Sequence, residues 1–254
     1  MTEFKAVPAV EKTVHILQTL AGASSRGMGV SEISTALSYS KGTVYSILQT
    51  LLVNHIVEKN LSTNKYSLGL GLIQLAESYN HRSLLISCFM EIGQEMSAHC
   101  KENINLSYLR NGYNCSIASI PAVNNYVLKV ELPVGELIPA ISSSSGKILL
   151  SSMADSEIRR IFEAQYYPYT ESTVSSADEF IEMIHQVREN GYAMNNAEYG
   201  PGVCSVSAPV FDSSRSIIAA MNIVVPQVRF TPEVRSELIA LVIENARRLS
   251  RMIV

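Results

Sequence analysis

The chain has 254 residues, of which 47% are hydrophobic and 17% charged, and its formal net charge is −3. These values are typical of a folded globular protein and exclude the disordered and fibrous classes. No apolar run approaches the ~18 residues of a membrane helix, and the first residues lack a secretory signal pattern. The cysteines show no Cys-x-x-Cys spacing. We therefore expect reduced thiols, a cytoplasmic location, no metal and no cofactor.

The amino-terminal part shows three helical patterns and then a hairpin pattern. Apolar residues at helical spacing predict helices in "AVEKTVHILQTLAG", after Ser31 and after Ser40, with both serines as N-caps. Two short strands around a polar turn at 62–64 follow. Helices and hairpin in this order predict a winged helix-turn-helix, whose third helix can enter a DNA major groove.

The outward face of the third predicted helix carries hydrogen-bonding or small side chains where a solvated helix would carry Glu and Lys. Lys41 and Lys65 are placed to meet phosphates, and Thr43, Tyr45 and Gln49 to face bases. A packing or protein-contact domain is the alternative. The candidate DNA-binding residues are Ser40, Lys41, Gly42, Thr43, Tyr45, Ser46, Gln49, Asn64 and Lys65.

One stretch carries a family resemblance. "GVSEISTALSYSKGTVYSILQTLLVNHIV", with the later "NKYSLGLGLIQLA", resembles the amino-terminal domain of the IclR family of bacterial transcription regulators. Two positions depart from the family pattern: Gly42 stands where serine is usual, and Ser46 stands where arginine is common. Both departures reduce the expected contacts to DNA and leave the domain type unchanged.

The rest of the chain has a different pattern. A helix over 68–82 is expected to join two domains, with the boundary near Arg82. Beyond it lie a helix to about Cys100 and strand-like runs "INLSYLR", "CSIASI" and "YVLKVEL", separated by Asn-Gly and Asn-Asn turns. Helices near Asp155 and Asp178, strands "GVCSVSAPVF" and "SIIAAMNIVV", and a final helix capped by Thr231 complete the pattern. It predicts an α+β fold with a mostly antiparallel sheet flanked by helices.

The segment "ISSSSGKILL" (141–150) admits several interpretations. The interpretation as a phosphate-binding P-loop is excluded, because Ile141 and Ile148 occupy the positions where that motif needs glycine and Ser or Thr. Ser144 and Lys147 match the Ser-x-x-Lys pair of a serine hydrolase, but the partner motifs of that class are missing. A serine-capped helix start remains, either as a plain cap or as an anion site formed by backbone N–H groups, with Lys147 expected to point outward. We expect that the protein is not an enzyme.

A second resemblance favours a ligand site. "GELIPAISSSSGKILLS" and "GYAMNNAEYGPGVCSVSAPVFD" look like IclR-family segments around an effector pocket. The resemblance implies a GAF-like effector-binding domain, a homodimer or homotetramer and a double-stranded operator DNA partner. Three positions depart from the family pattern. Asn195 stands where the family has an acidic residue, Ser145 where it usually has alanine or glycine, and Asn222 where it has serine. The implied effector-binding residues are Ser144, Ser145, Gly146, Asn195, Ser205 and Asn222.

The expected organisation is a winged helix-turn-helix at 6–68, a linker helix at 69–83 and an effector-binding domain at 84–254. The expected function is a sequence-specific DNA-binding transcription regulator. Its effector is expected to be a small organic acid. A sugar acid or hydroxy acid is favoured over a keto acid, and a dicarboxylate is a further alternative. The alternatives are a serine hydrolase and a protein-interaction module without DNA binding.

Overall fold

The computed structural model describes residues 7–23, 27–79, 83–123 and 128–253, with the side chains of 76–79 and 83 left aside. The chain divides into two compact units, residues 1–82 and 83–254. Residue 6, where the first domain was expected to start, and the predicted turn at 124–125 lie outside the described residues. No described helix is both long and apolar enough to cross a membrane.

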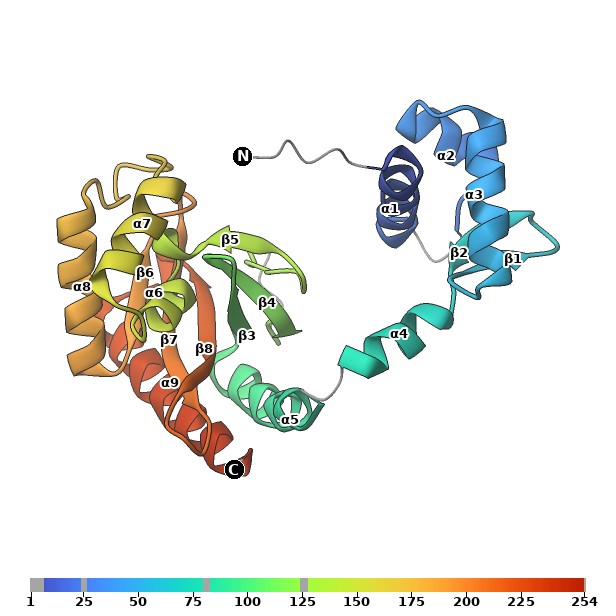
Figure 1. Ribbon diagram of the computed structural model, residues 1–254. Helices are drawn as coiled ribbons and strands as arrows, with labels where there is room; N and C mark the ends of the chain where they lie inside the picture. The colour runs from blue at the N-terminus through green and yellow to red at the C-terminus, as the bar shows by residue number, and fades with distance from the viewer. Residues whose placement is uncertain (1–6, 24–26, 80–82, 124–127, 254) are drawn as a thin grey trace. The chain divides into compact units, whose positions relative to one another are not determined.

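The N-terminal unit contains a helical bundle and a two-stranded wing (Figure 1). The antiparallel wing strands pair Val57 with Leu68 and Asn60 with Lys65, and Met28 adds one bridge to Tyr66. The winged helix-turn-helix prediction is confirmed. The elements are α1 Pro8–Ala21, α2 Val30–Leu37, α3 Lys41–Val53, β1 Val57–Asn60, β2 Lys65–Leu68 and α4 Gly71–Tyr79.

The apolar periodicity of α3 explains which of its faces is free. Val44, Leu48 and Leu51 recur at helical spacing and are buried against α1, α2 and the wing. The opposite face leaves Lys41 and Tyr45 exposed. The face expected to read DNA is therefore open to solvent.

The two predicted N-caps have different outcomes. Ser40 caps α3 as predicted, because its hydroxyl accepts the N–H of Thr43 at 3.2 Å. Ser31 does not cap α2, which begins at Val30 with Gly29 as its N-cap. The carboxylate of Glu32 reaches back and accepts the N–H of Gly29 at 2.6 Å. A helix-internal carboxylate thus replaces the expected serine.

The C-terminal unit is built on one six-stranded sheet in the order β5-β4-β3-β8-β7-β6, with every neighbouring pair antiparallel. Its 3-10 turns are η2 Ala140–Ser142 and η3 Gln227–Arg229. The predicted α+β fold is confirmed. The helices are α5 Ser83–Cys100, α6 Ser144–Leu150, α7 Asp155–Gln165, α8 Ala177–Asn190 and α9 Pro232–Met252. The strands are β3 Asn103–Arg110, β4 Tyr113–Ile120, β5 Leu137–Pro139, β6 Ala193–Asn196, β7 Val203–Phe211 and β8 Ile217–Pro226.

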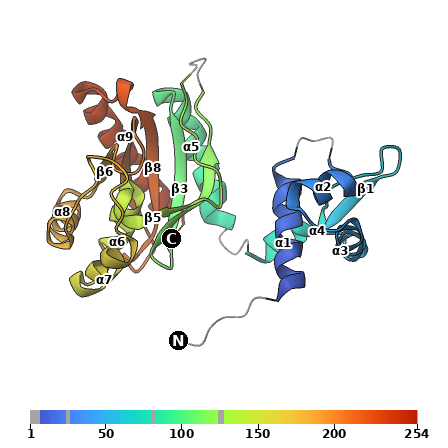
Figure 2. The ribbon, with the colours of Figure 1, turned by 90° about the horizontal axis from the view of Figure 1, so that it is seen from above.

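The two faces of this sheet differ in chemistry. Ile104, Leu106, Val206, Met221 and Ile223 point to one face and form the main core with α5 and α9. The alternate positions point the other way, toward the short helix α6. These alternate residues are buried and mostly polar: Asn103, Asn105 and Ser107 on β3, Ser205 and Ser207 on β7, and Asn222 on β8. Figures 1 and 2 show α5 and α9 on the first side of the sheet and α6, α7 and α8 on the second.

One strand prediction is wrong. The alternating run 126–132 predicts a strand, yet the described residues 128–132 form none, and β4 pairs instead with the short strand 137–139. The apolar side chains of Val130 and Leu132 face a pocket rather than a neighbouring strand. Strand β6 was not predicted, because its sequence "AMNN" lacks an apolar run.

Candidate effector pocket and DNA-binding surface

A pocket of about 240 Å³ opens over the polar face of the C-terminal sheet. Its floor comes from β4, β7 and β8, one wall from the η2–α6 junction, and another from the loop between β6 and β7. The lining mixes apolar walls with amides, hydroxyls and two carboxylates. The lining residues are Asn114, Val130, Glu131, Leu132, Glu136, Ile138, Ser142, Ser143, Asn195, Tyr199, Gly200, Val203, Ser205, Asn222 and Val224.

Three lining side chains hold buried polar atoms without a hydrogen-bond partner among the described residues. They are Oδ1 of Asn114, Oγ of Ser142 and Oδ1 of Asn222, and each residue is at most 4% exposed. A buried polar atom left unpaired costs about 1–3 kcal/mol, so such atoms are uncommon in folded proteins. Three of them around one cavity form a set of ready partners for a polar ligand.

Of the predicted effector residues, Asn195, Ser205 and Asn222 line this pocket, and Ser144, Ser145 and Gly146 do not. The Ser144 hydroxyl is 2.6 Å from that of Ser205 and 2.7 Å from that of Ser207. The Ser145 hydroxyl is 3.2 Å from that of Ser207. These contacts fasten α6 to the sheet. In their place, Ser142 and Ser143, just before α6, face the cavity.

Gly146 has a packing role. A Cβ atom added to it would lie 2.0 Å from the carbonyl oxygen of Ala140 and 2.4 Å from the Cα atom of Ala140. Only glycine therefore allows η2 to press directly against α6. That contact sets the position of Ser142 at the pocket wall.

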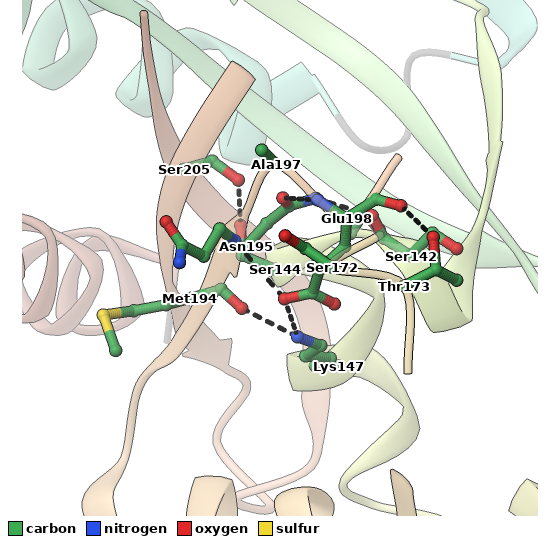
Figure 3. Close-up of polar contacts among 12 residues, drawn as sticks. Ser142, Ser144, Lys147, Ser172, Thr173, Met194, Asn195, Ala197, Glu198 and Ser205 are labelled. Atoms are coloured by element: carbon green, nitrogen blue, oxygen red, sulfur yellow. Dashed lines mark hydrogen bonds and ion pairs between the residues drawn. The ribbon is translucent and has the colours of Figure 1, made fainter. Parts of the chain in front are cut away.

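The expectation that Lys147 points outward is wrong. Its side chain is 1% exposed, and its Nζ lies 2.7 Å from Oε1 of Glu198 and donates to the Met194 carbonyl at 2.9 Å (Figure 3). Burial lowers the pKa of the Lys147 ammonium, and the Glu198 carboxylate acts against this by raising it. Every residue of α6 is buried, Lys147 included. A buried ammonium group needs a counter-charge, and the Glu198 carboxylate supplies it.

Asn195 connects two walls of the pocket. Its Nδ2 donates to the Ser142 carbonyl at 2.6 Å, and its Oδ1 accepts the N–H of Glu198 at 3.0 Å. An aspartate could accept the second bond but could not donate the first. The amide at this position thus ties the η2–α6 junction to the β6–β7 loop, a role that its neutral side chain makes possible (Figure 3).

The sequence reasoning missed Asn114, Ser142, Ser143 and Tyr199 as pocket residues. The sequence does contain a pattern that predicts the strands at the floor of the pocket. In "NINLSY" (103–108) and "CSVSAP" (204–209), small polar residues alternate with apolar ones, as in a strand with one solvated face. In this protein the polar face is buried. The alternation therefore indicates a polar site that other elements cover.

The charges at the pocket are negative. Glu131 and Glu136 are exposed at its rim, and no lysine or arginine occurs in the lining set. The buried ammonium of Lys147 is already bound to Glu198. A ligand in this pocket therefore meets amides and hydroxyls, with carboxylates at the entrance.

The Ser-x-x-Lys pair of the hydrolase alternative is not assembled in this structure. The Ser144 hydroxyl contacts two serines of β7, whereas Nζ of Lys147 contacts Glu198 and Met194. A serine nucleophile requires its base within hydrogen-bond reach. The two side chains instead hold α6 against β7 and the β6–β7 loop.

The predicted DNA-binding residues lie along α3 and the wing. Gln49 is half-buried and donates to the hydroxyl of Tyr66 at 3.0 Å. Lys65 is bound to Glu32, with 3.0 Å between its Nζ and Oε1. Thr43 contacts the hydroxyl of Ser40 at 2.8 Å, close to the helix start. The exposed members of the set are Ser40, Lys41, Gly42, Tyr45, Ser46 and Asn64.

One unit thus carries a winged helix-turn-helix, and the other carries a polar pocket. Two family models match the chain: "IclR helix-turn-helix domain" over 9–61, and "Bacterial transcriptional regulator IclR C-terminal" over 78–251. The chain belongs to the IclR family of bacterial transcription regulators.

Individual relatives agree with this assignment. The chain is 33% identical over 247 residues to the HTH-type transcriptional regulator KdgR of Escherichia coli strain K12, covering 96% of this chain and 92% of that one. It is 31% identical to KdgR of Dickeya chrysanthemi, over 96% and 79% of the two chains. The crystal structure of Thermotoga maritima IclR shares the fold, with a TM-score of 0.81, 20% identity and coverage of 97% and 98%.

Proposed function

We propose that the operator affinity of this regulator is controlled by a small hydroxylated organic acid, a sugar acid or hydroxy acid, bound in the C-terminal pocket. The observation that carries the proposal is the set of unpaired buried atoms of Asn114, Ser142 and Asn222 around a cavity of about 240 Å³. Two of these atoms are amide oxygens, which accept hydrogen bonds from ligand hydroxyls. A ligand with several hydroxyl groups matches them better than an apolar one.

The acid group would be held without a full positive charge. Hydroxyl groups of Ser142, Ser143 and Ser205 can donate to a carboxylate, and the lining set offers no cationic side chain. Glu131 and Glu136 at the rim repel anions, most strongly those with two charges. These features favour one carboxylate and several hydroxyls over a dicarboxylate.

The DNA-binding unit is proposed to act in a homodimer or homotetramer on a double-stranded operator, with α3 in the major groove. Leu70, just before α4, and Ile73 and Leu75 on α4 are each more than half exposed and offer an apolar surface for self-association. The proposed contacts of Lys41 and Lys65 are with phosphates. Those of Thr43, Tyr45 and Gln49 are with base edges.

Replacing Asn222 with leucine should weaken effector binding and leave apo DNA binding intact. Leucine has a similar volume, and it removes the amide from the pocket floor, where the residue is 4% exposed. Isothermal titration calorimetry of the full-length protein with a panel of sugar acids, hydroxy acids, dicarboxylic acids and aromatic acids would measure the change. We expect at least tenfold weaker binding, because a ligand hydroxyl loses its buried partner at a cost of about 1–3 kcal/mol.

Asn245→Leu provides the matched control, because Asn245 lies on α9, which packs on the opposite face of the sheet. This variant should bind the ligand as the wild type does. Tight binding only to aromatic or uncharged apolar compounds would contradict the proposed ligand class. Equal binding by both variants would contradict the role of Asn222 in the pocket.

A further inference from the structure

The surface between α2, α3 and the wing holds a shallow depression of about 440 Å³. Its rim includes Tyr45 of α3, which is 52% exposed, and Asn64 of the wing turn. Lys59 and Lys65 of the wing also line it, as does one carboxylate, Glu32 of α2. The depression thus joins the reading helix to the wing and contains two positive charges and one negative charge.

Glu32 has two contacts in this depression, and each uses a different oxygen. Oε2 accepts the N–H of Gly29 at 2.6 Å, which caps α2. Oε1 accepts from Nζ of Lys65 at 3.0 Å, across 33 residues of sequence. Both contacts lower the pKa of the Glu32 carboxyl, the Gly29 N–H by more than Lys65, so the group is ionised at neutral pH.

The Lys65 ammonium consequently has a partner before DNA arrives. A DNA phosphate beside the wing would have to share or displace the Glu32 carboxylate, and that carboxylate would also repel the phosphate. The side chains of Lys65 and Glu32 are 34% and 50% exposed, and an exposed ion pair of this kind stabilises a protein only weakly. Phosphates can therefore break the pair, at a cost that lowers DNA affinity.

We propose that Glu32 restrains DNA binding by holding Lys65, so that the Glu32–Lys65 pair opens when the wing meets the phosphate backbone. Glu32 is then a positioning residue on the DNA-binding surface, in addition to its capping of α2. The inference rests on the DNA-binding function and is independent of the effector pocket.

The test is a double-mutant cycle with Glu32→Gln and Lys65→Ala in the full-length protein. Glutamine keeps an oxygen for the N–H of Gly29, so the cap of α2 is retained while the charge is lost. Affinity for a mixed-sequence DNA duplex is measured by fluorescence anisotropy over a series of salt concentrations. Thermal unfolding of each variant checks that the fold is kept.

Glu32→Gln should tighten DNA binding about two- to fivefold at low salt in the wild-type background. It should also steepen the slope of log affinity against log salt by up to about one unit, because Lys65 then releases a full counterion. In the Lys65→Ala background the same change should give little or no gain. An equal gain in both backgrounds would show that Glu32 acts only as a distant charge, and no gain in either would show that the pair does not oppose DNA. Both results would overturn the proposal, whereas a wild-type protein that binds no duplex at all would contradict the DNA-binding function itself.

Discussion

Replacing Lys147 with methionine should destabilise the C-terminal unit by about 3–5 kcal/mol, because it leaves a buried carboxylate without its counter-charge. Oε1 of Glu198 would lose the ammonium at 2.7 Å, and Oε2 has no hydrogen-bond partner among the described residues. Glu198 is 6% exposed, so water cannot replace the lost contact. Urea unfolding followed by circular dichroism would measure the free energy of unfolding of this unit.

Two further variants separate charge from packing. Lys147→Met combined with Glu198→Leu removes both charges and should recover most of the lost stability. Lys129→Met makes the same replacement at an exposed lysine and should change stability by less than about 0.5 kcal/mol. If Lys147→Met proved as mild as Lys129→Met, the buried ion pair would have no structural role.

Replacing Gly146 with alanine should destabilise the same unit by about 3 kcal/mol or more, through overpacking that no side chain can relieve. The added Cβ atom would meet two backbone atoms of Ala140 at 2.0 and 2.4 Å. Either η2 or α6 must move, and both carry pocket residues or their supports. We therefore expect weaker effector binding together with a lower free energy of unfolding, measured by calorimetry and urea titration.

Gly42→Ala is the matched control in the other unit. Apart from the backbone of α3 itself and the two adjoining residues, no heavy atom of the described residues lies within 4 Å of a Cβ added at Gly42, which lies in the first turn of α3. Alanine there should stabilise the N-terminal unit, by up to about 1 kcal/mol, because glycine is a poor helix former. A destabilisation of similar size in both variants would contradict the packing explanation for Gly146.

Local patterns in the sequence predicted much of the fold. The stripe of Val44, Leu48 and Leu51 predicts α3 and its open face, and Ser40 predicts its cap, because these signals depend only on neighbours along the chain. Thr231 likewise caps α9, and Gly191 ends α8 in the left-handed conformation. Alternation failed as a strand signal at 128–132, where Val130 and Leu132 face the pocket.

The pocket could be predicted only in part. Asn195, Ser205 and Asn222 were found through segments that resemble the family. The pairing of Lys147 with Glu198, 51 residues apart, leaves no local signal in the sequence. The same holds for Glu32 and Lys65, and for the contact of Gly146 with Ala140, which depends on how η2 folds back. Tertiary packing decides which polar groups face the pocket and which hold α6 against the sheet.

Ligand binding in the C-terminal pocket is proposed to change the affinity for the operator. The most direct measurement selects genomic DNA fragments bound by the full-length protein and then compares the dissociation constants of the selected and scrambled duplexes, with and without a calorimetrically identified ligand. We expect the protein to prefer the selected sequence by ~10³ or more, and a bound ligand to change the dissociation constant of that sequence by about 5- to 150-fold. Equal affinity for both duplexes, or an operator affinity that no bound ligand alters, would contradict this proposal.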